Sequence, residues 1–356
     1  MKISAENGNY EQTNALNVLR IIFILCIIVF HTKDGLCSVG LKVYQFISAR
    51  GGYLGNIWFF MLAGFVTELN YRNRIIDGEL SVTQYVIRSL RRIYPLYIIT
   101  TGVMIILNII NENYNALSFK SILLNITLTT SGWVDDVYPL NVPGWFLSQL
   151  LLMKLLYFLS ARLFGKRGFL STIYIVYMTA GYALLGRNLN FPFLYNHNAE
   201  GLLYFYSGCL LCVGFNFSTR EQRKYVIASC VPITVIYILF AWKQGIDTAL
   251  GSFPIFLMSL VYPLIFILTL DVSALNKFLS NNEFLQRTAK LTMPLYLWHV
   301  PIANIFSKMI AAGLLKKGAV TLIAYYVTIF VISWMTVNIG YRLHHLKSNK
   351  ASRDIL

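Results

Sequence analysis

The stretch NVLRIIFILCIIVFHTK, residues 17–33, is an almost unbroken apolar run that carries Arg20 and His31 near its ends. A helix needs about 20 apolar residues to cross the hydrocarbon core of a bilayer, so a transmembrane helix is predicted over residues 13–31. Arg20 and His31 are eleven positions apart. At about 100° and 1.5 Å per residue, both side chains project from one face, about 16 Å apart along the axis.

This shared face is a candidate functional surface, because an ionisable side chain inside a membrane is unfavourable and usually faces the bundle interior or a water-filled cavity. Each residue taken alone also has a simpler interpretation. Arg20 would then extend to the membrane interface, and His31 would be an ordinary residue at a helix end. Their common face favours the functional interpretation.

The rest of the chain is equally apolar. Of its 356 residues, 56% are hydrophobic and only 13% are charged, and the mean hydropathy is +0.59. A soluble domain carries about 25% charged residues, so the chain has too little polar surface for a water-soluble globule. It is predicted to form one all-α domain, residues 1–356, a polytopic membrane helical bundle of about ten transmembrane helices. These are expected near residues 13–31, 52–70, 93–111, 144–163, 169–186, 201–217, 225–242, 253–272, 291–309 and 319–341.

The basic residues predict the orientation of the bundle. The net charge of +15 comes from Lys and Arg between apolar runs, which indicates membrane topology rather than nucleic-acid binding. With the N-terminus in the cytoplasm, 20 of the 30 Lys and Arg residues lie on the cytoplasmic side, as the positive-inside rule requires. Both termini are therefore predicted to be cytoplasmic: a short segment, residues 1–12, and a basic tail, residues 343–356. The expected location is the inner or plasma membrane, with multiple crossings.

An arginine-rich run precedes the third predicted span. Arg88, Arg91 and Arg92, in the stretch YVIRSLRRIYP (residues 85–95), are three and four positions apart and share a helical face. The planar fork of Arg suits phosphate, because it makes two parallel charged hydrogen bonds. The alternative is that these residues serve only as a positive-inside signal, which needs nothing but charge.

Two later stretches place polar residues inside predicted spans. NVPGWFLSQ, residues 141–149, carries Trp145 and Gln149, and LTMPLYLWHV, residues 291–300, carries Tyr296 and His299 on one helical face. Trp145 at a span end is also typical of an interface anchor. The histidines of the chain form no convincing metal-ligand set, and the adjacent His344 and His345 are expected to be solvated in the basic tail.

These motifs together resemble the acyltransferase-3 family of bacterial membrane O-acyltransferases, over essentially the whole chain. The family's arrangement of Arg, ten residues and His is matched by Arg20 and His31. Its aromatic second-span motif appears as FFMLAGF, residues 59–65, with Ala63 in place of Ser. The other matches are the arginine run ending at Pro95, the fourth-span WFLSQ, with Gln149 where Glu is common, and YLWH, residues 296–299.

The resemblance implies transfer of an acyl group, taken as acetyl, from cytoplasmic acetyl-CoA or another acyl-CoA to a hydroxyl of a cell-surface polysaccharide or its lipid-linked precursor. His31 and Arg20 are the expected catalytic residues. A hydroxyl needs a general base near neutral pH, and His is the usual choice; whether His31 deprotonates the acceptor or first accepts the acyl group stays open. Arg20 is expected to bind a donor phosphate or to orient the thioester.

The remaining implied roles concern binding. Arg88, Arg91 and Arg92 are expected to hold the donor, and the candidates for lining the cavity or holding the acceptor are Trp145, Gln149, Tyr296 and His299. The resemblance implies no permanently bound cofactor, no metal and no nucleic acid. The expected partners are acyl-CoA, the glycan acceptor and membrane lipid.

Two other functions fit a polytopic membrane protein. A glycan flippase, polymerase or other transporter without acyl chemistry would share the span count and the buried polar residues. A structural or sensory membrane protein would not need Arg20 or His299 inside its spans. Consumption of labelled acetyl-CoA by the purified protein separates the first of these from an acyltransferase.

Overall fold

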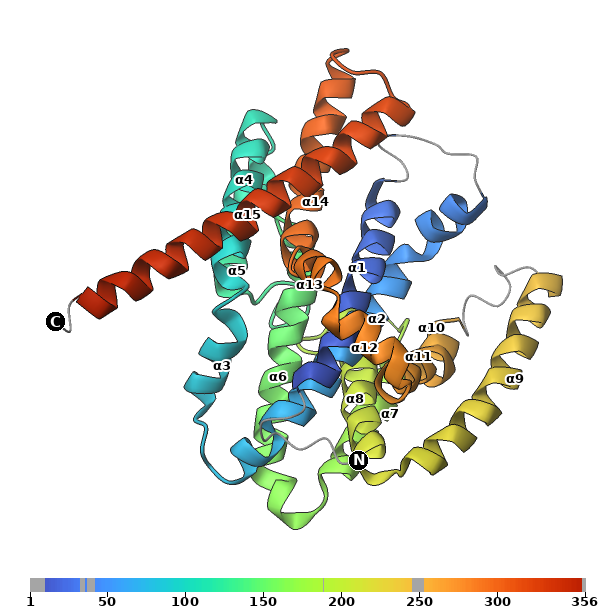
Figure 1. Cartoon of the computed structure of the whole chain (residues 1–356). Helices are drawn as coiled ribbons and strands as arrows, with labels where there is room; N and C mark the ends of the chain where they lie inside the picture. The colour runs from blue at the N-terminus through green and yellow to red at the C-terminus, as the bar shows by residue number, and fades with distance from the viewer. Residues whose placement is uncertain (1–9, 33–35, 37–41, 188, 245–252, 354–356) are drawn as a thin grey trace.

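The computed structural model describes residues 10–32, 36, 42–187, 189–244 and 253–353. Within these ranges the chain forms helices and loops and no strand (Figure 1), which confirms the all-α prediction. The segment 1–9 lies outside the described residues, as do the side chains of residues 343–353, His344 and His345 included.

Each of the ten predicted stretches is mainly helical, and short helices join them; the stretch 253–272 is divided between two α-helices and a π-helical turn. The helices are α1 (Tyr10–Thr32), α2 (Lys42–Ile76), α3 (Val82–Leu90), α4 (Tyr94–Ile110), α5 (Phe119–Thr127), α6 (Gly144–Phe164), α7 (Leu170–Leu184), α8 (Asn196–Phe217), α9 (Arg220–Gln244), α10 (Phe253–Phe256), α11 (Tyr262–Asp271), α12 (Ser273–Asn281), α13 (Glu283–Ala289), α14 (Thr292–Ala311) and α15 (Ala319–Arg353). A π-helical turn, η3 (Leu257–Val261), joins α10 to α11, and two 3₁₀ turns, η1 (Tyr114–Leu117) and η2 (Gly165–Arg167), lie in loops.

Length and apolar composition identify the helices able to cross a membrane. In the described part of the chain four qualify: Asn14–Thr32, Gly144–Arg167, Phe253–Asp271 and Ala319–Gly340. A fifth is added if α3 and α4, which meet at a bend of 58°, are counted as one broken span. The protein is therefore an all-helical membrane protein.

Small residues let α2 and α8 approach closely. A Cβ atom added at Gly64 of α2 would lie 1.9 Å from the carbonyl oxygen of Phe205, and one added at Gly208 of α8 would lie 2.0 Å from that of Met61. Neither backbone leaves room for a side chain, so the two helices are in direct backbone contact, as is common between membrane helices. Gly64 belongs to the FFMLAGF motif.

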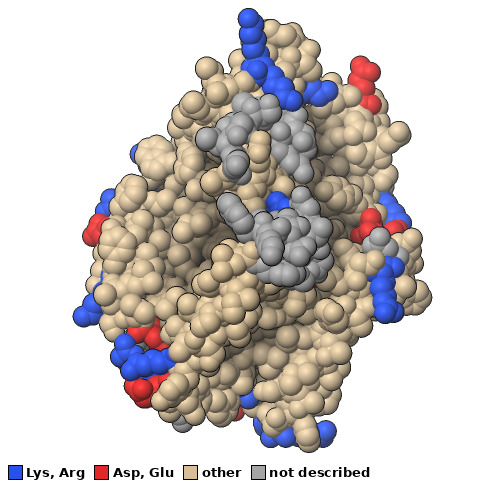
Figure 2. Space-filling view, turned by 90° about the vertical axis from the view of Figure 1, so that its right-hand side faces the viewer, with Lys and Arg blue, Asp and Glu red and all other residues tan. Residues whose placement is uncertain are grey.

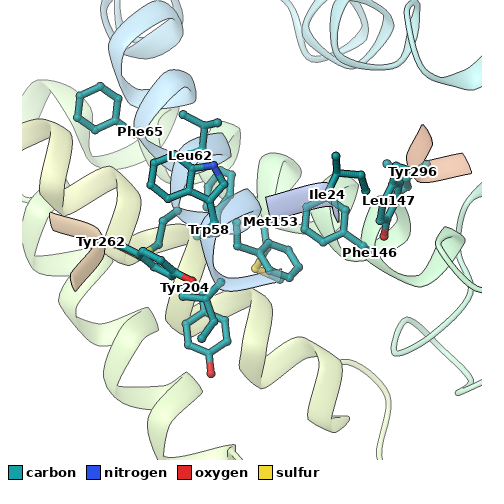
Figure 3. Packing of buried hydrophobic residues seen from close by; sticks show 14 of the residues in the cluster. Ile24, Trp58, Leu62, Phe65, Phe146, Leu147, Met153, Tyr204, Tyr262 and Tyr296 are labelled. Carbon is teal, nitrogen blue, oxygen red and sulfur yellow. The ribbon is translucent and has the colours of Figure 1, made fainter. Parts of the chain in front are cut away.

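Aromatic side chains fill the centre of the bundle, where α1, α2 and α11 pack together. Trp58 of α2 is fully buried; its ring stacks on Phe23 of α1 at 4.4 Å between centroids and lies 4.8 Å from Phe266 of α11. Figure 3 shows Trp58 beside Leu62 and Tyr262, with Phe146 and Tyr296 grouped separately. This packing fixes α1, which carries Arg20 and His31, in the middle of the fold.

The outer surface is apolar. Large hydrophobic side chains such as Val320 and Trp334 of α15 and Ile236 of α9 are exposed, and on the face shown in Figure 2 the charged side chains gather in small groups at the margins. A soluble monomer rarely exposes apolar patches of this extent. The surface fits contact with lipid.

Two charged groups inside the helix bundle are fully paired. Arg223 of α9 makes hydrogen bonds of 2.6 and 2.9 Å to the carboxylate of Asp271 in α11. Glu68 of α2 accepts hydrogen bonds from Arg72 at 2.7 Å and from Tyr157 and Tyr174 at 2.7 and 2.6 Å. Because every partner is present, these groups serve packing rather than chemistry.

Candidate functional site

Two cavities lie along α1, and one residue, Tyr296 of α14, lines both. The first has a volume of about 420 Å³, and its lining includes His31, Trp145, His197, Glu200 and His299; it is called the histidine cavity here. The second has a volume of about 250 Å³, and its lining includes Arg20, Phe59, Arg88, Phe146 and Lys154; it is called the arginine cavity. The two residues predicted to share a face of the first span thus line different cavities.

In the histidine cavity, two histidines from opposite ends of the sequence lie together. The rings of His31, in the last turn of α1, and His299 of α14 are 5.1 Å apart between centroids. His299 is completely buried, and its Nδ1 lies 2.6 Å from the carbonyl oxygen of Tyr296. This contact requires a proton on Nδ1, so Nε2 is an acceptor. Among the described residues, His299 Nε2 has no hydrogen-bond partner.

A proline in α14 helps to fix His299. Pro301 has no backbone N–H, so the carbonyl of Leu297, four residues earlier, lacks its usual helical donor. The side-chain amide of Asn141 donates to this carbonyl at 3.1 Å and to the hydroxyl of Thr100 at 3.0 Å. The hydroxyl of Tyr325 in α15 donates to the carbonyl of His299 at 3.1 Å. The helix turn that carries His299 is therefore held from two sides.

The other aromatic group of the histidine cavity comes from α6 and α8. Trp145, in the first turn of α6, stacks on His197 of α8 with 4.3 Å between ring centroids and 22° between planes. Glu200 follows His197 on the same helix face, and its Oε2 lies 3.7 Å from His197 Nδ1. Trp145 was a predicted cavity residue and lies in the cavity lining. His197 and Glu200 were not predicted as site residues.

The arginine cavity combines cations with apolar walls. Arg20 of α1 donates a long 3.5 Å hydrogen bond to Asn17, and its Nε is buried without a hydrogen-bond partner among the described residues. Lys154 of α6 donates to the hydroxyl of Ser89 at 3.2 Å. Arg88, in the last turn of α3, is exposed and joins the lining. The cavity thus presents three cationic side chains with few competing anions.

The predicted arginine run divides at the bend between α3 and α4. Arg88 lines the cavity, whereas Arg91 and Arg92 are exposed at the bend and outside the lining. The flanking Ser89 and Ile93 do line the cavity. Arg91 and Arg92 are therefore next to the cavity lining rather than part of it.

Three aromatic rings lie together where the two cavities adjoin. Tyr296 lies 5.9 Å from Phe146 and 6.5 Å from Phe59 between ring centroids, and its hydroxyl donates to the carbonyl of Pro143 at 3.0 Å. Tyr296, Phe146 and Phe59 are called the aromatic partition below. Of the three, Tyr296 lines both cavities, and Phe59 and Phe146 line the arginine cavity.

Gln149 lies outside the described linings of both cavities, in a buried network. Its amide nitrogen donates to the carbonyl of Ser131, and its amide oxygen accepts from Asn198 of α8 at 3.1 Å. A carboxylate has no hydrogen to donate and would repel the Ser131 carbonyl, which explains why an amide stands here. Gly132, at a φ of +100°, passes so close that an added Cβ would lie 2.8 Å from the Gln149 amide nitrogen.

Three ionisable side chains that line the cavities were not predicted as site residues from the sequence. Lys154 carried a usable signal, a cation in the middle of an apolar span. His197 and Glu200 carried none, because they lie at the start of a helix in a polar context and gain their significance only by packing against Trp145. No cluster of three or more His, Cys, Asp or Glu side chains suited to a metal ion occurs in the described residues.

The family comparison covers nearly the whole chain. A family model described as an acyltransferase domain matches residues 13–338, a range that includes every residue named in the two cavities. Neither the curated proteins nor the solved structures include a match to the chain.

Proposed function

The chain belongs to the acyltransferase-3 family, and on that premise we propose that it transfers an acetyl group from cytoplasmic acetyl-CoA to a hydroxyl of a cell-surface polysaccharide or of its lipid-linked precursor. The observation that carries this proposal is the pair of chemically different cavities that meet at Tyr296. One is cationic and suits a phosphorylated donor. The other is rich in histidine and suits deprotonation of a hydroxyl.

Coenzyme A is an anionic donor, and the arginine cavity matches its charge. Arg20, Arg88 and Lys154 offer cationic donors for phosphate or carbonyl oxygens. At about 250 Å³, the cavity is below the usual range of about 300–1,000 Å³ for small-molecule sites. It therefore takes the uncharged thioester arm, whose carbonyl oxygens can accept hydrogen bonds from Arg20 and Lys154. The phosphates then lie at the exposed Arg88, with the exposed Arg91 and Arg92 next to it.

The chemical step belongs to the histidine cavity. His31 accepts the proton of the acceptor hydroxyl as its oxygen forms a bond to the thioester carbonyl carbon. The carbon–sulfur bond then breaks, and the proton passes to the departing coenzyme A sulfur, so the products are an ester and a free thiol. His299, 5.1 Å from His31 between ring centroids, is held with its acceptor Nε2 available in this cavity. It positions His31 in its catalytic orientation.

Arg20 and His31 have separate tasks because of their spacing. They are about 16 Å apart along the helix axis, and each lines its own cavity. Arg20 orients the donor end nearest the partition, and the acetyl group passes Tyr296 to reach His31. Acetyl-CoA is thus a substrate rather than a permanently bound cofactor.

We further propose that the whole chain, residues 1–356, is one domain that crosses the inner or plasma membrane about ten times with both termini in the cytoplasm. The helix found at each predicted span and the excess of Lys and Arg on one side support this topology. Reporter fusions at Leu356 test it. A cytoplasmic reporter is expected to be active there, and an active periplasmic reporter would contradict the topology and the cytoplasmic donor site.

The activity itself is tested with purified protein in lipid nanodiscs and acetyl-CoA labelled in the acetyl group. Wild-type protein is expected to release free coenzyme A thiol and to pass the label to a hydroxyl acceptor or to water. The Arg20→Ala and His31→Ala variants are expected to lose this release. Thiol release by the wild type no greater than by these variants would favour a flippase, polymerase or transporter without acyl chemistry.

A further inference from the structure

His197 and Glu200 form an incompletely satisfied pair in the wall of the histidine cavity. His197 Nδ1 and Glu200 Oε2 are 3.7 Å apart, which is too long for a hydrogen bond. His197 Nδ1 is buried and has no hydrogen-bond partner among the described residues. An unsatisfied buried polar atom in a native site needs an explanation, and here a ligand group between the two atoms supplies one.

The spacing of this pair suits one bridging hydroxyl. A hydroxyl whose oxygen lies to one side of the line that joins the two atoms can donate its hydrogen to the Glu200 carboxylate and accept the hydrogen of a His197 ring protonated at Nδ1. Each contact is then at ordinary hydrogen-bond length, and the one to the carboxylate is charge-assisted. A thiol, an alkyl chain or a second carboxylate would not satisfy both atoms.

The surroundings of the pair suit a ring that carries hydroxyl groups. The His197 side chain is 30% exposed and is backed by the indole of Trp145, stacked at 4.3 Å. Aromatic faces of this kind pack against the C–H face of a ring while the ring's hydroxyls reach polar side chains. Glu200 is the only carboxylate in the described lining, and Asn56 and Tyr53 add further hydrogen-bonding groups.

A buried network holds the pair in place. Asn198, next to His197, donates to Gln149 of α6 at 3.1 Å and accepts from the backbone N–H of Tyr195 at 3.0 Å. Gln149 lies one helical turn after Trp145. The same hydrogen bond therefore fixes the start of α8 against the start of α6, and with it the stacked rings.

Resting on the function proposed above, we propose that Trp145, His197 and Glu200 form an acceptor subsite for a pyranose ring, in which His197 and Glu200 bind one hydroxyl of the sugar that is not acetylated. The subsite holds the ring so that another hydroxyl faces His31. It makes the acceptor a sugar ring rather than a linear polyol.

The test uses acetyl-CoA with four probes: methyl β-D-glucopyranoside, methyl β-D-galactopyranoside, methyl N-acetyl-β-D-glucosaminide and glycerol. Wild-type protein in nanodiscs is expected to acetylate at least one glycoside with a kcat/KM at least tenfold above that for glycerol. Glu200→Gln and His197→Phe are each expected to raise the KM for that glycoside about tenfold or more, with a smaller change in kcat, because a contact kept from ground state to transition state acts mainly on binding.

Two control variants test whether the effect on the glycoside KM is specific to His197 and Glu200. Glu283→Gln, at an exposed carboxylate paired with Arg287, removes the same charge far from the cavity and is expected to leave the glycoside KM unchanged. His197→Phe keeps an aromatic ring on Trp145 but no Nδ1, whereas His197→Ala removes both and is expected to weaken binding further. Coenzyme A binding, measured separately, reports whether each variant is folded.

The outcomes separate the subsite from the proposed function. Equal KM values for Glu200→Gln and Glu283→Gln would overturn the subsite while acyl transfer stands. Thiol release with no preference for any glycoside over glycerol would overturn the pyranose assignment alone. Absence of thiol release by the wild type would overturn the proposed function and the subsite with it.

Discussion

The two cavities beside α1 differ in charge, in size and in the kind of hydrogen-bonding group they offer. The arginine cavity holds Arg20, Arg88 and Lys154 and is the smaller, whereas the larger histidine cavity contains His31, His197 and His299 with a single carboxylate in its described lining. Cations bind an anionic donor over its whole reaction path, but a base must gain and lose a proton. The charges that bind the donor are thus in one cavity and the group that transfers a proton is in the other. Variants in the two cavities should therefore differ in whether donor binding or the rate of acyl transfer is lost.

The largest expected effect comes from the histidine cavity. We expect His31→Ala to reduce acyl transfer by at least about 10²-fold, since general-base catalysis contributes about 10²–10⁴-fold. Coenzyme A binding should be retained, because His31 lies outside the lining of the arginine cavity. The measurement is label transfer from acetyl-CoA together with a coenzyme A titration. Activity near that of the wild type would make His299 the first candidate for the base.

Arg20→Ala is the corresponding change in the arginine cavity. Among the described residues Arg20 makes one long hydrogen bond, to Asn17, and its buried Nε has no partner, so its guanidinium is available to the donor. We expect turnover at saturating acetyl-CoA to fall about 10-fold to 100-fold, the size of one lost charge-assisted contact of about 1.5–3 kcal/mol. Turnover that recovers fully at high donor concentration would show that Arg20 only binds.

These two residues also show what sequence spacing can predict. The period of an α-helix predicts a shared face for Arg20 and His31 on α1 and for Tyr296 and His299 on α14, because these relations lie within single helices. Tyr296 and His299 do line one cavity together. The division of Arg20 and His31 between two cavities depends on which side chains of α2, α6 and α14 line each cavity. No spacing within one helix contains that information.

Gln149 and His197 show more clearly what a sequence pattern cannot predict about the site. Gln149 stands at a motif position where a carboxylate is common, which suggested a cavity residue, but its hydrogen bonds to Ser131 and Asn198 place it in the packing between α6 and α8. His197 has no motif, and its place in the cavity follows from the stack with Trp145. For both residues, contacts between helices determine whether the side chain lines a cavity.

Arg88 and Arg91 allow a matched test of the arginine run. Both are exposed, carry the same charge and lie three residues apart, but only Arg88 lines the cavity. We expect Arg88→Ala to raise the KM for acetyl-CoA about tenfold, as for one charged hydrogen bond, and Arg91→Ala to raise it less. Because such contacts persist into the transition state, kcat should change little in either variant.

Steady-state titrations with acetyl-CoA at low and high salt measure this difference. The smaller contribution of Arg91 should be the more sensitive to salt, since an exposed charge is screened more strongly. Membrane insertion of both variants is checked by the Leu356 reporter. Equal KM values for the wild type and both variants would show that the run is a topology signal alone.

The smallest expected effect concerns the aromatic partition between the cavities. Tyr296→Phe keeps the ring and removes only the hydroxyl that donates to the Pro143 carbonyl at 3.0 Å. Tyr325→Phe is a matched control, since it likewise removes one buried tyrosine hydrogen bond, from α15 to the carbonyl of His299 at 3.1 Å. Both variants should lose about 1 kcal/mol of stability, the usual net contribution of one hydrogen bond, measured as a lower unfolding temperature in nanodiscs.

The kinetics should separate the two tyrosines. Only Tyr296 lines both cavities, so a looser ring there should admit longer acyl groups past the partition. We expect Tyr296→Phe to raise the ratio of butyryl to acetyl transfer about twofold to threefold, less than the tenfold that a difference of 1.4 kcal/mol would give. Tyr325→Phe should leave this ratio at the wild-type value. If both variants shift the ratio equally, α14 responds as a whole and Tyr296 has no particular part in the passage of the acyl group. If neither does, the acyl group does not pass Tyr296, and the donor thioester must reach His31 by another route through the bundle.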